Sequence, residues 1–248
     1  MRKVLLIFVA AMLLPGTTTM AAGGFDFAAA ERRFAAVHLP STSLHEAERG
    51  PDGARGYGMA IPQGLMAAPP TSPPPPFSTM REWYTHGQYC GWDAIVRATL
   101  LDSTPVLTAN KSLIYTVSHF AVVDVLKSDA PFRKGERMLV YRVGGELVDD
   151  GEKLMVDTTQ DMAPFKPQRS YILILDRDKG ASARQYYIPE MQTILVRDEY
   201  VYPISGRWAW LSNTKAFPWG TSYANIQGTF RKVSRVVCPK SGSRGPVL

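Results

Sequence analysis

Apolar and polar side chains alternate most clearly between residues 113 and 127, in the stretch LIYTVSHFAVVDVLK. Thr116, Ser118 and Asp124 fall on one pleat face, and the apolar set falls on the other. That apolar set comprises Leu113, Tyr115, Val117, Ala121, Val123 and Val125. The period of two predicts a strand, which at roughly 3.3 Å per residue would extend about 50 Å. We expect a strand of this length to bend, as the strands of small barrels do.

Shorter strands with turn signals between them are predicted on both sides of this stretch. Residues 92–101 (WDAIVRATLL) alternate and are expected to form the first strand, followed by a connecting turn over residues 102–111. Further strands are expected over residues 136–143, 153–159, 170–175, 184–189 and 193–201. Asp149-Asp150-Gly151 predicts a hairpin turn, because Asp and Gly tolerate positive φ. This succession indicates a mainly β fold, a sandwich or a barrel.

Helical periodicity is confined to the two ends of the chain. Residues 25–37 predict a short alanine-rich helix whose apolar side carries Phe27, Ala30, Phe34 and Val37. A C-terminal helix is predicted within residues 221–237, where Thr221 or Ser222 can cap it. Its apolar positions are Tyr223, Ile226, Phe230, Val233 and Val237. We expect this helix to pack on the strands, with almost no helix between the two ends.

The first 22 residues have the layout of a secretory signal peptide, with Arg2 and Lys3 ahead of an apolar run that ends at Leu14. The alternative, a membrane anchor, would need about 20 apolar residues, and no later stretch reaches that length either. We therefore expect an exported protein, periplasmic or secreted. The formal charge of +6 includes both basic residues of the leader, so the mature chain is only mildly basic. In an exported protein, this mildly basic net charge argues against a nucleic-acid partner.

Composition divides the rest of the chain into four parts. Residues 23–68 are an N-terminal segment, in which a short helix precedes a Gly-, Ser- and Pro-rich stretch, 41–65, that is expected to be poorly ordered. Residues 69–76 (PPTSPPPP) predict a stiff polyproline linker, the alternative being a ligand for a proline-recognition module. Residues 77–238 are the predicted folded domain, and residues 239–248 a flexible tail.

Two cysteines and four histidines are the residues that bear most on chemistry. In an exported chain Cys90 and Cys238 predict a disulfide that joins the two ends of the domain, the alternatives being free thiols or a thiol ligand or nucleophile. His86 and Cys90 supply only two of the three or four ligands that zinc needs. His119 is expected on the apolar face of the long strand, as a core histidine. The sequence thus predicts no metal and no cofactor.

Aromatic residues gather in the segment RWAWLSNTKAFPWG, residues 207–220. The candidate binding surface consists of Trp208, Trp210, Phe217 and Trp219. These rings either cover one end of the domain as a lid or form an exposed patch for a protein, peptide or glycan partner.

Three stretches carry a resemblance to a known family. Cys90 precedes WDAIVRATLLDS, a long strand ends in VVDVLKSDAPFRKGERMLVYRVGG, and FKPQRSYILIL follows. Over Cys90 to Val201 this layout resembles the domain of the netrin-module and tissue-metalloproteinase-inhibitor type, and most of all uncharacterised exported bacterial proteins that share it. The resemblance implies a small OB-like β-barrel, closed or partly open, with a C-terminal α-helix. Protease inhibition is not implied, because the inhibitors use an N-terminal cysteine and Cys90 lies inside this chain.

These patterns favour an exported, non-enzymatic binding module for a protein, peptide or glycan. The first alternative is an envelope hydrolase that uses His86 or His119 with nearby carboxylates. The second is a structural envelope protein held by the basic face of the C-terminal helix.

Overall fold

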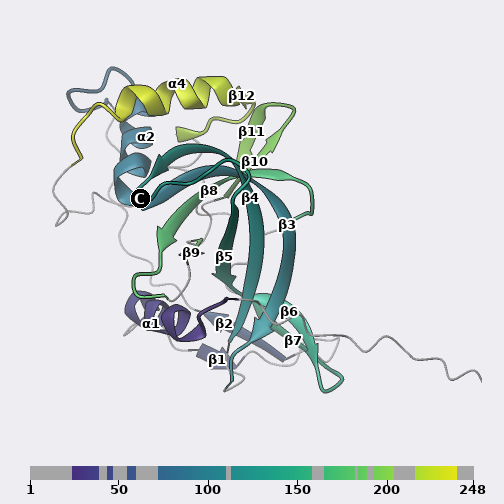
Figure 1. Ribbon diagram of the computed structural model, residues 1–248. Coiled ribbons are helices and arrows are strands. Elements are labelled where there is room, and N and C mark those ends of the chain that lie inside the picture. The colour runs from purple at the N-terminus through teal and green to yellow at the C-terminus, as the bar shows by residue number, and fades with distance from the viewer. Residues whose placement is uncertain are drawn as a thin grey trace, which may run out of the picture.

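The computed structural model describes residues 24–38, 44–46, 55–59, 72–109, 113–157, 165–181, 184–188, 193–203 and 216–238. Over these residues strands predominate, and the chain ends in a helix on the outside of the sheet (Figure 1). The mainly β fold class and the C-terminal helix are thus confirmed. The helices are α1 (Phe27–His38), α2 (Met80–Gly91) and α4 (Tyr223–Val233). Within the described residues, no helix combines the length and apolarity that crossing a membrane requires.

Eight strands form one sheet in the order β12-β11-β10-β8-β3-β4-β5-β9. Their bounds are β3 Ala94–Leu107, β4 Ile114–Ser128, β5 Arg137–Val143, β8 Ser170–Arg177, β9 Gln185–Tyr187, β10 Thr193–Arg197, β11 Tyr200–Pro203 and β12 Thr221–Ser222. Strand β9 pairs in parallel with β5 and antiparallel with β8, so that β3, β4, β5, β9 and β8 close into a ring. Strands β10 to β12 continue the sheet beyond this ring.

A second sheet joins the N-terminal segment to the domain. Its order is β1 (Leu44–Glu46), β2 (Arg55–Met59), β7 (Glu152–Asp157) and β6 (Gly145–Asp149). Strand β2 pairs in parallel with β7, so two parts of the stretch expected to be poorly ordered form strands instead. The expected signal peptide and tail, residues 1–22 and 239–248, lie outside the described residues, as does the start of the linker.

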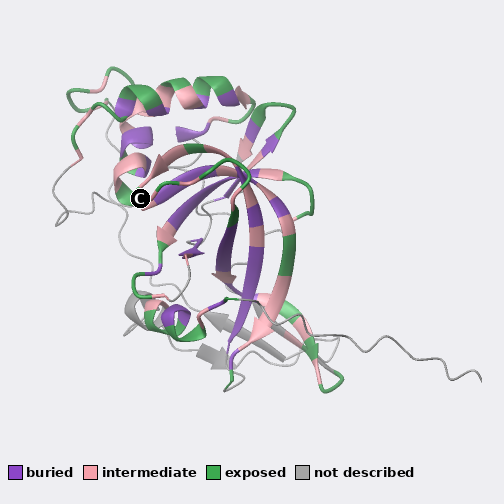
Figure 2. Cartoon of the chain, viewed as in Figure 1, coloured by how far each residue is buried: buried purple, intermediate pink, exposed green. Residues whose placement is uncertain are grey.

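Three apolar clusters hold the ring and its helices together. The interior cluster fills the ring and includes Val96, Leu100, Phe120, Val140, Tyr171 and Leu173. The α4 cluster lies between the outer face and helices α2 and α4, and includes Ile95, Ile172, Ile194, Phe217, Ile226 and Phe230. The α1 cluster lies under α1 and includes Phe25, Ala30, Tyr115, Leu139 and Tyr141. In Figure 2 the buried residues of the two long strands lie in one part of each strand, within residues 94–100 of β3 and 114–122 of β4, and the rest is half-buried or exposed.

Strand β4 is buried on both faces at its start and on only one face further along, and this overturns the expected burial of His119. Tyr115 and Val117 are buried in the α1 cluster, whereas Phe120 and Val122 point to the other face, into the interior cluster. Beyond Val117 the first of these faces is no longer covered by α1. His119 follows on that uncovered face and is half-buried at the surface, so it is not a core histidine.

Helix α2 is a correction to the expectation of almost no helix between the two ends. Its N-cap is Thr79, whose hydroxyl accepts a hydrogen bond from the Glu82 backbone N–H at 3.2 Å. The Glu82 carboxylate in turn accepts from the Ser78 backbone N–H at 2.9 Å. This exchange is close to a capping box, a signal that the aromatic composition of residues 82–92 obscures.

Two other local expectations were wrong, and one was confirmed. Residues 102–107, expected as a turn, continue β3, and Pro105 is tolerated there because β3 pairs only with β4 beyond Thr99. In α1, Ala29 and Ala30 are buried while Phe27 is 36% exposed, because the short side chains let the helix approach the sheet. The hairpin turn is confirmed, with φ of 49° at Asp150 and 82° at Gly151.

Candidate functional sites

An exposed aromatic surface lies where the sheet continues beyond the ring. We call Tyr200, Tyr202 and Trp219 the aromatic surface. In β11 the Val201 side chain points into the α4 cluster, so its neighbours Tyr200 and Tyr202 face the opposite side. Tyr200 is 47% exposed and Trp219 71% exposed. The rings of Tyr202 and Trp219 meet edge to face, with centroids 5.2 Å apart.

Backbone hydrogen bonds fix Trp219 beside β11. Gly220, with φ of 71°, donates its N–H to the Val201 carbonyl at 2.9 Å, and β12 then pairs with β11. Tyr223 donates its backbone N–H to the Glu199 carbonyl at 2.7 Å. The tryptophan is therefore displayed on an ordered turn rather than at a free chain end.

The four aromatic residues singled out from the sequence fall in different environments. Phe217 is fully buried and packs against Phe230 with ring centroids 5.7 Å apart, so it belongs to the core rather than to an exposed surface. Trp219 is exposed. Trp208 and Trp210 lie outside the described residues. Tyr200 and Tyr202 were missed, although strand alternation next to an apolar Val201 was a usable signal.

A second candidate site is the pair formed by His119 and Asp102 on neighbouring strands. The imidazole Nδ1 lies 2.6 Å from Asp102 Oδ1, and Arg137 Nη2 lies 3.3 Å from Asp102 Oδ2. An irregularity in β3 between Leu100 and Asp102 sets this register. The carboxylate can hold the ring so that Nε2 is turned outward as a proton acceptor. Ser118 faces the opposite side, where its hydroxyl lies 2.9 Å from that of Ser103.

His86 and the two cysteines form a third cluster, between α2 and the end of the described chain. Cys90 and Cys238 form a disulfide with Cα atoms 5.4 Å apart, which confirms the expected pairing and excludes free thiols in this state. His86 is 7% exposed, and burial lowers the pKa of its imidazole. Its Nε2 lies 3.3 Å from both Cys90 Sγ and the Val236 carbonyl oxygen. Among the described residues, the histidine that contacts a carboxylate is His119.

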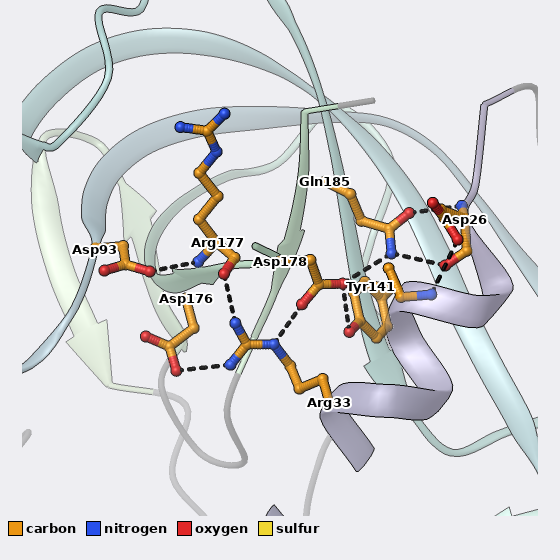
Figure 3. A network of polar contacts seen from close by, with 9 residues as sticks. Asp26, Arg33, Asp93, Tyr141, Asp176, Arg177, Asp178 and Gln185 are labelled. Carbon is orange, nitrogen blue, oxygen red and sulfur yellow. Dashed lines mark hydrogen bonds and ion pairs between the residues drawn. The ribbon is translucent and has the colours of Figure 1, made fainter. Parts of the chain in front are cut away.

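The most buried polar network joins α1 to the ends of β8 and β9 (Figure 3). The Asp178 carboxylate, with 1% of its side chain exposed, accepts from Arg33 Nε, from the Tyr141 hydroxyl at 2.8 Å and from Gln185 Nε2 at 2.8 Å. Arg33 Nη1 also lies 3.0 Å from Asp176 Oδ2. Burial, and then the Asp178 charge, raise the pKa of the Tyr141 hydroxyl above its ordinary value.

The hydrogen-bond donors and acceptors of this network satisfy one another, which indicates a structural role. The Asp178 oxygens are occupied by the Arg33, Tyr141 and Gln185 donors just described. Gln185 also accepts from the Asp26 backbone N–H at 2.8 Å and donates to the Asp26 carbonyl at 3.1 Å. These contacts fix the start of α1 on the ring. The sequence shows no sign of them, because the partners lie more than 140 residues apart.

Neither a family model nor a curated protein matches the chain. The relation to the netrin-module and inhibitor domain stays a prediction.

Proposed function

We propose that the chain is an exported binding module whose partner docks on the aromatic surface, Tyr200, Tyr202 and Trp219. The observation that carries this proposal is Trp219, which is 71% exposed although a backbone turn and the Tyr202 ring hold it in place. An exposed tryptophan loses little conformational entropy on binding when it is already fixed, and Trp and Tyr dominate the energetics of binding surfaces. The closed ring supports an OB-like scaffold beneath it.

The surface fits a partner that offers flat apolar faces together with polar groups. By strand register Arg197 lies opposite Tyr200 and Leu195 opposite Tyr202, so these four residues share one face of the sheet. The Arg197 side chain is 66% exposed, and its Nε lies 3.4 Å from the Asp198 carboxylate, so this face carries an exposed ion pair beside Tyr200. Sugar rings and extended peptides both present this combination, and they are the classes of partner that the proposal covers.

The test is a binding screen of the full chain against immobilised oligosaccharides and unstructured peptides, followed by affinity measurement on the strongest binder. Trp219→Ala is expected to weaken binding at least tenfold, equivalent to about 1.4 kcal/mol, and Tyr200→Ala to weaken it less. Val148→Ala is the matched control, because Val148 on β6 is 69% exposed and lies in the other sheet. The proposal fails if Trp219→Ala binds like the parent, or if Val148→Ala loses as much.

A second candidate function is hydrolysis with His119 as general base. The observation that favours it is the 2.6 Å contact between His119 Nδ1 and Asp102, which is the geometry of a base held by an orienting carboxylate. Activity on a panel of activated esters would be measured for the parent, His119→Ala and Asp102→Asn. Loss of roughly a hundredfold in both variants is expected from general-base catalysis. Unchanged rates in folded variants would remove this candidate.

A further inference from the structure

Helix α2 and the segment after α4 bring together three side chains of the types that zinc prefers. His86 and Cys90 are four residues apart and therefore share one face of α2. Cys238, five residues beyond the end of α4, completes the group. The ligand atoms of the three side chains all lie within 4.8 Å of one another. In the present state the two sulfurs are bonded to each other, so neither is a thiolate.

We propose that reduction of the Cys90–Cys238 disulfide by a dithiol converts this cluster into a zinc site. The dithiol supplies two electrons and two protons, forms its own disulfide and leaves two cysteine thiols. Zn²⁺ then displaces the two thiol protons and binds both thiolates and the His86 imidazole. A water takes the fourth tetrahedral position, as in zinc sites with three protein ligands.

The distances in the oxidised protein are close to those that the site requires. Zn–S bonds of about 2.3 Å and Zn–N bonds of about 2.0–2.1 Å place tetrahedral S and N ligands about 3.6 Å apart and two S ligands about 3.8 Å apart. His86 Nε2 already lies 3.3 Å from Cys90 Sγ. The two sulfurs must separate, and side-chain rotation provides this, because their Cα atoms are 5.4 Å apart.

The surroundings of His86 hold its ring in the required place. The imidazole is 7% exposed and packs against the Phe77 ring, with centroids 4.8 Å apart. Nε2 now contacts the Val236 carbonyl oxygen. In the metal-bound state Nε2 turns its lone pair to the zinc, and the proton resides on Nδ1. Zinc would thus replace the disulfide as the link between α2 and the segment after α4.

The experiment compares oxidised and reduced protein. Protein reduced with excess dithiol is freed of reductant without air, checked for its near-UV circular dichroism, and titrated with Zn²⁺ or with Co²⁺ as a coloured substitute. We expect one ion per reduced chain, a thiolate-to-cobalt charge-transfer band, and intense visible bands from tetrahedral Co²⁺. The oxidised protein should show none of these.

Variants distinguish zinc binding at the three-residue site from zinc binding by the cysteine thiols alone. His86→Ala is expected to weaken zinc binding by the reduced protein at least tenfold and to alter the cobalt spectrum, and Cys238→Ser should weaken it further. His119→Ala is the matched histidine control and should bind zinc as the parent does. The proposal is overturned if the oxidised protein binds equally, if reduced His86→Ala binds as tightly as the parent, or if folded reduced protein binds no zinc. It is also overturned if reduction unfolds the protein and zinc does not restore the near-UV signal.

Discussion

Two outer faces of the same ring are covered by helices in different ways. Helix α1 contributes small buried side chains, Ala29 and Ala30, and is fixed by the charge network around Asp178. Helix α4 instead buries a row of large side chains at 4% exposure or less: Tyr223, Ile226, Phe230 and Val233. One contact depends on a few directional polar groups, and the other on apolar area spread over many residues.

This difference decides how each contact responds to damage. A buried ion pair contributes little net stability, because desolvation offsets the attraction between the charges, but losing one partner leaves the other buried and unpaired. Apolar burial adds up over many small contributions. We therefore expect the α1 contact to fail when a single residue is changed, and the α4 contact to weaken by degrees.

Of the changes to these two contacts, Asp178→Ala is expected to have the largest effect on stability. Arg33 would lose its buried partner, and Tyr141 and Gln185 would lose an acceptor, so a loss of about 3–5 kcal/mol in the free energy of unfolding is expected. Urea denaturation measures the total, and amide hydrogen exchange should show α1 opening first. Asp176→Ala is the control, because Asp176 lies at the edge of the network and its loss should cost about 1 kcal/mol or less. Equal effects of the two variants would contradict a network centred on Asp178.

Removal of the disulfide addresses the other face. The double variant Cys90→Ala and Cys238→Ala opens a loop between cysteines 148 residues apart, and the expected loss is about 2–4 kcal/mol. Amides of α2 and α4 should exchange faster, while those of α1 keep their protection. A loss of protection confined to α1 would show that the two faces are not separate in this way.

The smallest expected effect is a pH dependence of stability that comes from the contact between α2 and α4. Glu82 on α2 accepts from Lys232 of α4, which lowers the pKa of its carboxyl, and the Ser78 N–H adds to this. A lowered folded-state pKa stabilises the protein above the unfolded value of about 4.3, and this stabilisation disappears as pH falls through the folded-state value. Urea midpoints of the parent and Glu82→Gln should therefore differ at pH 7 and converge as pH falls through the lowered folded-state pKa of Glu82. A difference that stays constant over this range would exclude the ion pair as its source.

The sequence predicts a structural feature when the signal for that feature lies in adjacent residues. The alternation in residues 113–127 predicted β4 within one residue at either end, and Asp149-Asp150-Gly151 predicted its hairpin, because both signals lie in adjacent positions. The alternation placed His119 correctly on the face of Val117, but its exposure could not be predicted, because exposure depends on where α1 stops covering β4. Asp178 gave no signal for the same reason, since all its partners come from other elements.

The candidate sites follow the same rule. The exposure of Trp219 agrees with the interpretation of residues 207–220 as an exposed patch. Phe217, two residues earlier, instead points into the core. Composition does not distinguish these two rings, because the turn at Gly220 and the pairing of β12 decide which one faces outward. Cys238 as a third neighbour of His86 likewise required the packing of α2 against α4.

The disulfide also makes most of the domain a covalent circle. Residues 90 to 238 are closed on themselves by one sulfur bridge, and the ring, the aromatic surface and α4 all belong to this loop. A protease that cuts once inside the circle therefore opens it without releasing a piece, and the nicked protein gains one water but stays covalently connected until it is reduced. A single cut before Cys90 releases α1 as part of a fragment. Exposed loops within the circle can thus be cleaved while the molecule stays in one piece.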